Sequence, residues 1–564
     1  MTTLPATAPD AGARPRSATP RPSPVPAERW LLPAALVLVL ALQLPLVLHR
    51  AINWDEFWHY NLTVLAAQGQ LDQPLQTLFT RVFMWVPGLP GNPVDHIVLI
   101  RLFMLGCEVV VLACIAAIAG RFSDRNTGLL CALAYLSSIF VFQHGTSFRY
   151  DPQAAALLMG SLWVLVCRPA TARWMVLAGV LGGLAAMITI KSVLYAPVFA
   201  GVFWLRWNEN GRTRAALGGL AIMVLAAAIT FAAVYLWHTS TIVEAPGSGA
   251  GDLVRASGEK MFSLTEHLYL LHNLKGAIFS PVMTVLALAC PFAIALAKRP
   301  AAERAALAGF WLPLTTLGFY HNTAPYFHVF MLAPVAVSLA AIMPAAVRRY
   351  GIKPLAATFV LLTAMLLWRE EESPIGKQRE IIATASEIFG EPVAYFDSSA
   401  MLGQFRKANP FMTPWGIHRY LRGEFPSMTA TMERQAVPLV VENDPLFTQA
   451  LRTRANVNGL LPQDLAALRA TYIPYWGPLW IAGFDLPAGS AEQTLLVRVP
   501  GPYTVHGNAS VIVNGTAYEP GSVFTLERGP HRIAAPDAAA RLVWGDRLAQ
   551  PARPAPAEPY FMGF

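Results

Sequence analysis

The sequence predicts a polytopic α-helical membrane protein that carries a folded region outside the membrane. Of its 564 residues, 55% are hydrophobic and only 13% are charged, whereas a soluble protein carries about a quarter charged residues. About eleven apolar runs fill residues 30–368, and each is long enough to cross a bilayer core of roughly 30 Å. The basic residues return between these runs, so the net charge of +8 reflects membrane topology and indicates no nucleic-acid partner.

The order of apolar runs and basic connections predicts the topology. Arginine and lysine gather in alternate connections, which the positive-inside rule places in the cytoplasm. An odd number of spans then puts the aromatic-rich connections and the C-terminal region outside. The composition, rich in alanine, arginine and proline, indicates a bacterium of high genomic GC content, and hence the inner membrane with a periplasmic C-terminal domain. The predicted spans lie near residues 30–49, 97–119, 127–143, 152–167, 174–190, 192–207, 216–237, 277–297, 305–320, 326–343 and 354–368.

The segments around this transmembrane domain (30–368) differ in composition. Residues 1–29 are rich in proline and poor in acids, which predicts a disordered cytoplasmic N-terminus. The connection 50–96 is predicted to form short helices on the membrane surface. Apolar runs at 393–397 and 437–441 predict an α/β region over 369–490, and short strands between turn residues predict a small β-sandwich over 491–550. Residues 551–564 are predicted to form a loose tail.

The first external connection carries two acids among aromatic residues. Asp55 and Glu56 lie within residues 54–60, and adjacent helical side chains point about 100° apart, so we expect the two acids to have different roles. We interpret them as catalytic carboxylates, one of which deprotonates or orients an acceptor. The alternative is a solvated helix N-terminus beside an interfacial aromatic belt.

Other charged residues on the same face are candidates for binding a phosphate. Arg149 precedes Asp151, which is either a further catalytic carboxylate or an ordinary helix cap before Pro152. Lys191 interrupts an apolar stretch, which is costly unless the amine reaches the interface or an anion. Arg81 either contacts a phosphate or extends to lipid headgroups. We assign Lys191, Arg149 and Arg81 to a donor phosphate.

Aromatic and imidazole side chains complete the predicted site. Two histidines near the tenth predicted span raise the alternative of a divalent metal, but no third ligand is fixed by spacing, so we predict no metal. The sequence has no Gly-rich phosphate loop of the Walker type, and we predict no nucleotide cofactor. The residues expected to line the acceptor and sugar sites are Trp54, Trp58, His59, Tyr60, His321, Tyr326 and His328.

This set of motifs resembles the GT-C superfamily of glycosyltransferases, in particular the branch of the protein O-mannosyltransferases and the lipid A aminoarabinose transferase. The family's acidic motif is matched by Asp55 and Glu56, and the likeness covers about residues 30–345. The chain departs from the family at His328, where many relatives carry Arg or Lys, and after Lys191, where the usual glycine is missing. Its second acid, lysine turn and late aromatic–basic motif are matched by residues 148–152, 188–192 and 326–334.

The resemblance implies inverting transfer of a sugar from a polyprenyl-phosphate donor, with Asp55 acting on an acceptor hydroxyl outside the cytoplasm. The donor's lipid would lie between spans in the bilayer, and the acceptor is a glycan, a lipid or a protein. A transporter or flippase of lipid-linked sugars is the main alternative; it predicts broken helices at the membrane midplane and two related halves, which the sequence does not display. A glycan polymerase or ligase would share the outward-facing site and differ in its acceptor, whereas a scaffold protein would give Asp55 and Lys191 no role.

Overall fold

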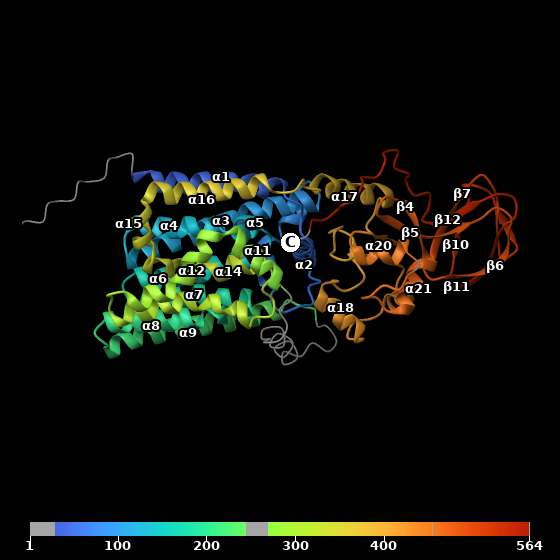
Figure 1. Cartoon of the computed structure of the whole chain (residues 1–564). Helices are drawn as coiled ribbons and strands as arrows, with labels where there is room; N and C mark the ends of the chain where they lie inside the picture. Colours follow the sequence, from blue (N-terminus) through green and yellow to red (C-terminus); the bar gives the residue numbers. More distant parts are fainter. Residues whose placement is uncertain (1–28, 244–268, 454, 563–564) are drawn as a thin grey trace, which may run out of the picture.

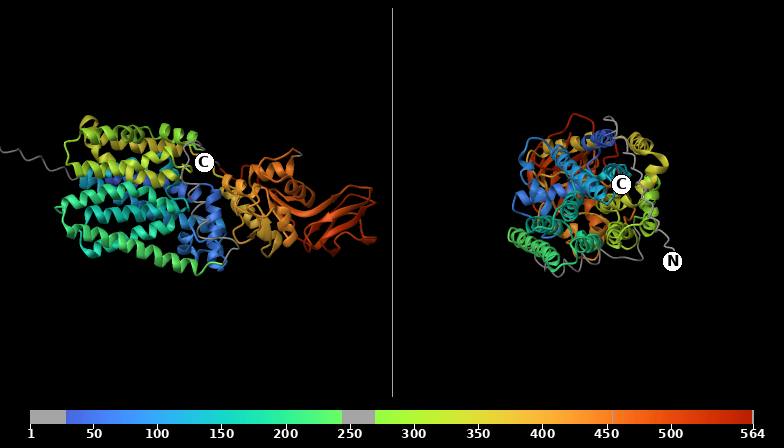
Figure 2. Two further views of the ribbon diagram at one scale, coloured as in Figure 1. Left: turned by 90° about the horizontal axis from the view of Figure 1, so that it is seen from below. Right: turned by 90° about the vertical axis from the view of Figure 1, so that its left-hand side faces the viewer.

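A computed structural model describes residues 29–243, 269–453 and 455–562, and shows a helical bundle joined to a C-terminal region that contains two sheets. The two parts lie end to end, and helix α2 lies where they meet (Figures 1 and 2). The N-terminal segment predicted to be disordered falls outside the described residues, except for Arg29.

The helices of the bundle follow the apolar runs of the sequence. They are α1 (Leu31–His49), α3 (Pro93–Phe122), α4 (Arg125–Leu136), α5 (Ile139–His144), α6 (Tyr150–Cys167), α7 (Ala172–Ile188), α8 (Ala196–Glu209), α9 (Arg214–Thr239), α11 (Leu270–Phe279), α12 (Pro281–Leu296), α13 (Ala301–Trp311), α14 (Phe327–Ser338), α15 (Met343–Tyr350) and α16 (Ile352–Trp368). Short 3₁₀ turns accompany them at η4 (Ile190–Tyr195), η5 (Leu312–Gly318) and η6 (Leu339–Ala341).

Among the described residues, three helices are long and apolar enough to cross a membrane, namely α1, α3 and α9. The number rises to five if the bent pairs Leu270–Phe279 with Pro281–Leu296, and Phe327–Ala341 with Met343–Tyr350, each count as one span. The bend of 100° between α11 and α12 falls at Pro281, because proline is accepted in the first turn of a helix but does not continue one. The count of eleven spans therefore stays a prediction.

The connection between α1 and α3 forms the surface against which the C-terminal region packs. It contains α2 (Trp54–Ala67), η2 (Leu78–Phe83) and η3 (Val86–Gly88). Helix α2 begins with a capping box: Asn53 Oδ1 accepts a hydrogen bond from the Asp55 N–H at 2.9 Å, and Glu56 Oε2 accepts one from the Asn53 N–H at 3.0 Å. These bonds fix the first turn of α2, and with it the direction of the two acids.

The C-terminal region begins with helices among short strands and ends in strands alone. Its first part comprises α17 (Ile375–Phe389), β1 (Ala394–Phe396), β2 (Arg406–Lys407), α18 (Pro414–Leu421), α19 (Met428–Arg434), β3 (Leu439–Val441), α20 (Pro445–Arg452), α21 (Pro462–Thr471), β4 (Tyr472–Trp476) and β5 (Leu479–Leu486). The remaining strands are β6 (Ser490–Val497), β7 (Gly501–Gly507), β8 (Val511–Val513), β9 (Thr516–Tyr518), β10 (Val523–Leu526), β11 (Gly529–Ala535) and β12 (Ala540–Trp544).

One sheet runs through both parts of this region. Its order is β10-β7-β12-β5-β3-β1-β2, with β4 also beside β5, and the second sheet has the order β6-β11-β8-β9. Strand β1 is parallel to β2 and β3, whereas the other pairs are antiparallel. The two parts have separate apolar cores. A boundary near residue 490 stays a prediction, because the first sheet crosses it through β5 and β12.

The C-terminal tail packs against the rest of the chain. Residues 551–562 form no helix or strand, but Gln378 Nε2 donates a hydrogen bond to the carbonyl of Tyr560 at 2.9 Å, and the Phe561 ring lies edge-on to Trp54 with ring centroids 5.9 Å apart. The prediction of a loose tail is therefore wrong for these residues. Tyr560 and Phe561 give the tail apolar surface for packing, which its proline- and alanine-rich composition did not indicate.

Candidate active site

Four charged side chains form one buried network where α2, α6 and η4 meet. Arg149 forms an ion pair with Asp55, and its Nε lies 3.3 Å from Oδ2 of Asp151. Lys191 Nζ lies 2.8 Å from the other carboxylate oxygen of Asp151. The side chains of Asp151 and Lys191 are 1% and 2% exposed, whereas that of Asp55 is 17% exposed. The structure thus brings four of the predicted site residues together, from three separate connections of the bundle.

The positions of Asp151 and Lys191 at the starts of α6 and η4 make them partners in a buried ion pair. Helix α6 begins at Tyr150 with Arg149 as its N-cap residue and without a side-chain cap hydrogen bond, so the alternative of Asp151 as an ordinary cap is wrong. Lys191 is buried at the start of η4, so the alternative that its amine reaches the membrane interface is wrong as well. Each of these charges needs the other, because an unpaired buried charge is costly.

Aromatic rings surround the two cations. The Arg149 guanidinium carbon lies 3.3 Å from the centre of the Tyr326 ring, and Lys191 Nζ lies 4.7 Å from the centre of the Tyr150 ring and 5.5 Å from that of Tyr326. Such contacts stabilise a cation in a partly dry site. Burial by itself disfavours the charged guanidinium, but the carboxylates of Asp55 and Asp151 raise the pKa of Arg149 well above its ordinary value. Arg149 is therefore a permanent cation.

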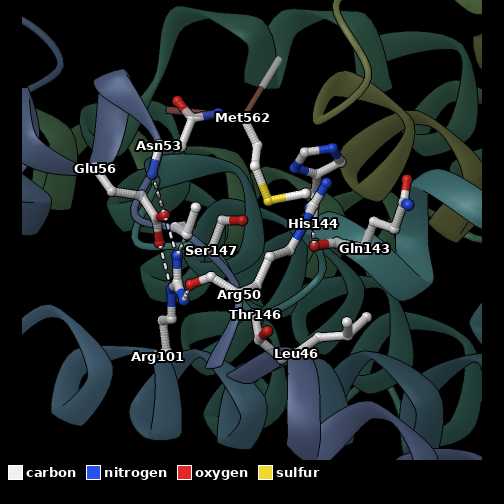
Figure 3. Close-up of a pocket in the computed structure, with 11 residues that line it drawn as sticks. Leu46, Arg50, Asn53, Glu56, Arg101, Gln143, His144, Thr146, Ser147 and Met562 are labelled. Atoms are coloured by element: carbon white, nitrogen blue, oxygen red, sulfur yellow. Dashed lines mark hydrogen bonds and ion pairs between the residues drawn. The ribbon is translucent and has the colours of Figure 1, made fainter. Parts of the chain in front are cut away.

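Glu56 faces away from this network and has a structural role. Its Oε1 accepts hydrogen bonds from Arg101 Nε and from the Phe148 N–H, both at 2.8 Å, and its Oε2 is bound by Arg101 and by the Asn53 N–H (Figure 3). Burial alone raises the pKa of Glu56, but the Arg101 guanidinium and the two backbone donors lower it overall. With four donors on its two oxygens, Glu56 anchors α2 to the segment that precedes Arg149, and our assignment of Glu56 as a catalytic residue is revised.

His59 lies beside the network and has unused hydrogen-bonding capacity. Its ring packs against Phe79, Phe148 and Tyr150, with centroid distances of 5.0, 6.1 and 5.6 Å. Neither ring nitrogen has a hydrogen-bond partner among the described residues. Burial, and then the charges of Arg149 and Lys191, lower the pKa of His59 well below its ordinary value. It is therefore a neutral imidazole, placed as expected for a residue that lines a sugar site.

The structure gives two other aromatic residues of α2 packing roles. Trp58 stacks on Phe411 of the C-terminal region with ring centroids 5.0 Å apart. Tyr60 is fully buried, and its hydroxyl lies 2.6 Å from His96 Nδ1. Both side chains connect α2 to its neighbours, so the expectation that they line the sugar site is revised. Trp54 lies at the edge of α2, against the C-terminal tail.

Arg81, His321 and His328 have other partners in the part of the chain that the structure describes. Arg81 Nε donates a hydrogen bond to His238 Nδ1 at the end of α9, at 2.7 Å, so this side chain holds η2 to α9. His321 lies edge-on to Trp415, with ring centroids 4.9 Å apart. His328 borders an apolar cavity of about 410 Å³ between α5, α11, α12, η5 and α14. Within the described ranges, no group of three or more His, Cys, Asp and Glu side chains is arranged to hold a metal ion.

Sequence reasoning missed residues whose signal was weak. Arg101 lies inside the apolar run of the second predicted span, where a charged residue indicates a buried partner. Tyr150 and Tyr320 contribute rings near Lys191, at 4.7 and 6.0 Å from its Nζ. Tyr150 was within the matched motif, whereas nothing in the spacing around Tyr320 predicted its position.

Comparison with known proteins agrees with this architecture. Residues 74–237 match the sequence profile of a family described as dolichyl-phosphate-mannose-protein mannosyltransferase. No curated protein sequence matches the chain. Among solved structures, the chain is similar to ArnT from Cupriavidus metallidurans bound to undecaprenyl phosphate, at 12% identity over 81% of this chain and 97% of ArnT, with a TM-score of 0.52.

The chain is also similar to the archaeal oligosaccharyltransferase AglB from Archaeoglobus fulgidus, solved in complex with an inhibitory peptide and a dolichol-phosphate, at 11% identity. That match covers 93% of this chain and 98% of AglB, with a TM-score of 0.50. The fold is that of the GT-C glycosyltransferases, and the predicted resemblance is confirmed. The match to the mannosyltransferase family covers residues 74–237, and the likeness to ArnT and AglB is one of fold.

Proposed function

We propose that the protein is an inverting glycosyltransferase that moves a sugar from a polyprenyl-phosphate donor to an acceptor hydroxyl at the periplasmic face of a bacterial inner membrane. The observation that carries this proposal is the network of Asp55, Arg149, Asp151 and Lys191. It combines a partly exposed carboxylate with two buried cations at the end of the bundle that meets the C-terminal region. ArnT and AglB, whose folds are similar to that of this chain, were solved with undecaprenyl phosphate and with a dolichol-phosphate, respectively. This supports a lipid-phosphate donor here.

Lys191 and Arg149 are proposed to bind the donor phosphate. In this reaction the phosphate is the leaving group, so negative charge develops on it as the bond to the sugar breaks. Hydrogen bonds from ionised donors in a site shielded from water stabilise such charge strongly. Asp151 contacts both cations, and its proposed role is to position them.

Asp55 is proposed to act as the general base. The acceptor oxygen attacks the anomeric carbon, the bond between that carbon and the phosphate oxygen breaks, and the phosphate leaves with the electron pair. The proton of the acceptor hydroxyl passes to Asp55. A single displacement inverts the configuration at the anomeric carbon. His59, neutral and without a hydrogen-bond partner among the described residues, is placed to bind a sugar hydroxyl.

The lipid part of the donor needs an apolar site that is continuous with the bilayer. The cavity beside His328 is lined mostly by apolar side chains, among them Phe140, Met283, Trp311 and Met331. It lies between helices of the bundle, where the prenyl chain of the donor would pack. We propose that it holds part of that chain.

Transfer assays with Asp55→Asn test this proposal. Membranes that contain the protein are supplied with radiolabelled polyprenyl-phosphate mannose, glucose, galactose or arabinose, and both labelled product and released polyprenyl phosphate are measured. Asp55→Asn should lower transfer by about 10²–10⁴-fold, the contribution of a general base. Glu372→Gln, a change at an exposed acid, is the matched control and should transfer like the wild type.

Two results would contradict the proposal in different ways. Full transfer by folded Asp55→Asn would remove Asp55 from the mechanism. Movement of an intact labelled donor across the membrane, without release of polyprenyl phosphate, would instead favour the transporter.

A further inference from the structure

The C-terminal region has a crevice at the point where the direction of its sheet connections reverses. Strand β1 lies between β2 and β3 and is parallel to both. The chain passes from β1 to β2 on one side of β1 and then returns to β3 on the other side. In open α/β sheets, ligands bind outside the carboxyl ends of the strands at such a reversal.

A cavity of about 280 Å³, lined by both polar and aromatic side chains, opens at this crevice and faces α2. Residues 442–445, which directly follow β3, form one wall together with Thr448 and Gln449 of α20. Trp54 and residues 558–561 of the tail form the opposite wall. Trp54 precedes Asp55, so the cavity borders the helix that carries the proposed base.

The floor of the crevice is fixed by hydrogen bonds between the two strand ends. Asp397, directly after β1, accepts hydrogen bonds from the Ala400 and Met401 N–H groups at 2.9 and 2.8 Å. Asn443 Nδ2 donates to the same carboxylate at 2.9 Å, and Lys407 Nζ lies 2.7 Å from it. Asn443 is therefore held in one orientation at the cavity, as is typical of a preorganised binding site.

The walls combine hydrogen-bond acceptors with aromatic rings. Carboxylates come from Glu442, Asp444 and Glu558, and Gln449 adds an amide. No lysine or arginine occurs among the described residues that line the cavity. Arg452 is paired with Glu442 and lies 4.0 Å from Glu558, so the three carboxylates of the walls face fewer cations than their own number. Such walls repel phosphate and carboxylate groups and accept hydrogen bonds from hydroxyls.

The cavity is also lined by three aromatic rings, which make it complementary to a sugar: those of Trp54, Tyr560 and Phe561. Aromatic faces pack against the C–H faces of a sugar ring while acceptor groups bind its hydroxyls, a combination of apolar surface and a few fixed polar groups that is typical of small-molecule sites. Burial raises the pKa of the Asp444 carboxyl, which agrees with a partly dry cavity.

We infer that this cavity binds an uncharged saccharide that forms part of the acceptor. The acceptor is then a neutral glycan, and phosphorylated lipids are excluded from the cavity by its carboxylates. The acceptor role of the saccharide rests on the proposed function, because only the reaction at Asp55 would make the bound saccharide an acceptor. Binding of the saccharide itself requires no transfer.

Binding to the full chain in lipid nanodiscs tests the inference without a donor. Mannotetraose, maltotetraose, galactotetraose and arabinotetraose are titrated calorimetrically, and mannotetraose phosphate serves as the anionic probe. At least one neutral probe should bind the wild type. Asp444→Asn keeps the helix cap but replaces a carboxylate oxygen, an acceptor, by an amide donor, and Gln449→Ala removes an amide, so each should weaken that binding about tenfold or more. Asp537→Asn, at an exposed acid of the same region, should bind like the wild type.

The inference is overturned if no neutral probe binds, if the anionic probe binds more tightly, or if both cavity variants bind like the wild type. Asp55→Asn separates it from the proposed function. Saccharide binding by that variant, in which transfer should be about 10²–10⁴-fold lower, supports the inference. A wild type that binds saccharide but transfers sugar from no donor contradicts the proposed function alone.

Discussion

Lys191→Met separates the structural role of this lysine from its proposed role at the donor phosphate. Lys191 Nζ lies 2.8 Å from Asp151, and both side chains are almost fully buried. Breaking a buried ion pair by removing one partner costs about 3–5 kcal/mol. Because Arg149 Nε still lies 3.3 Å from the other Asp151 oxygen, we expect the lower end of this range, about 3 kcal/mol. The free energy of unfolding in SDS mixed micelles measures this change.

The double variant Lys191→Met/Asp151→Asn distinguishes the two roles. Replacing both members of a buried pair by neutral side chains is often close to neutral for stability, so about 2 kcal/mol of the loss should be recovered. Transfer should nevertheless stay at least about 100-fold below the wild type, which corresponds to about 2.7 kcal/mol of transition-state stabilisation. If the double variant transfers sugar like the wild type, Lys191 does not bind the phosphate. If Lys191→Met is as stable as the wild type, the ion pair contributes nothing to the fold.

Three further changes test other parts of the structure. Glu56→Gln should destabilise the protein by about 3 kcal/mol, measured by the same unfolding assay, because it leaves Arg101 buried without a carboxylate; a variant as stable as the wild type but inactive would make Glu56 catalytic after all. His59→Phe should reduce the loss of stability on acidification. Burial lowers the pKa of His59, so below about pH 6.5 the unfolded chain takes up a proton that the folded protein does not. Between that pH and the lower pKa of the folded state, the wild type should lose up to about 1.4 kcal/mol per pH unit more than His59→Phe, and equal slopes would contradict this. Phe561→Ala should expose the tail, because it removes the ring contact with Trp54, and proteolysis after residue 550 should become faster; an unchanged cleavage rate would show that other contacts hold the tail.

The sequence predicted the helices and much of the network, because both follow from where polar groups can lie in a bilayer. A spanning segment must satisfy its backbone hydrogen bonds internally, so apolar runs become helices. The positive-inside rule then placed Asp55, Arg149, Asp151 and Lys191 on one face, and the structure brings them together. Residue type and sidedness were sufficient for this part of the site.

The pairing of the acids could not be predicted. Whether Asp55 or Glu56 faces the site depends on which cation lies nearby in the fold, and the partner of Glu56 is Arg101, 45 residues away on α3. No local pattern contains that information. The 100° spacing of adjacent helical residues correctly indicated different roles but did not assign them.

Strand β4 was also missed, for a physical reason. Strand β4 contains Pro474, which argues against a strand because proline donates no hydrogen bond to its neighbour. Among the described strands β4 pairs only with β5, so proline is accepted at this edge. The return of the tail to Trp54 likewise depends on a contact between residues that are far apart in the chain.

The charge balance of the network bears on the order of events in the proposed reaction. Two carboxylates face two cations, and a donor phosphate adds negative charge, so one cation must exchange a carboxylate for the phosphate. Asp151 is held by both cations and is 1% exposed, whereas Asp55 pairs with Arg149 and is 17% exposed. The pair of Asp55 with Arg149 is therefore the one that opens more easily. As Arg149 turns to the phosphate, the Asp55 carboxylate is released from its ion pair, and its oxygens become free to accept a hydrogen bond from the acceptor hydroxyl. Donor binding would then prepare the base before the acceptor hydroxyl has to lose its proton.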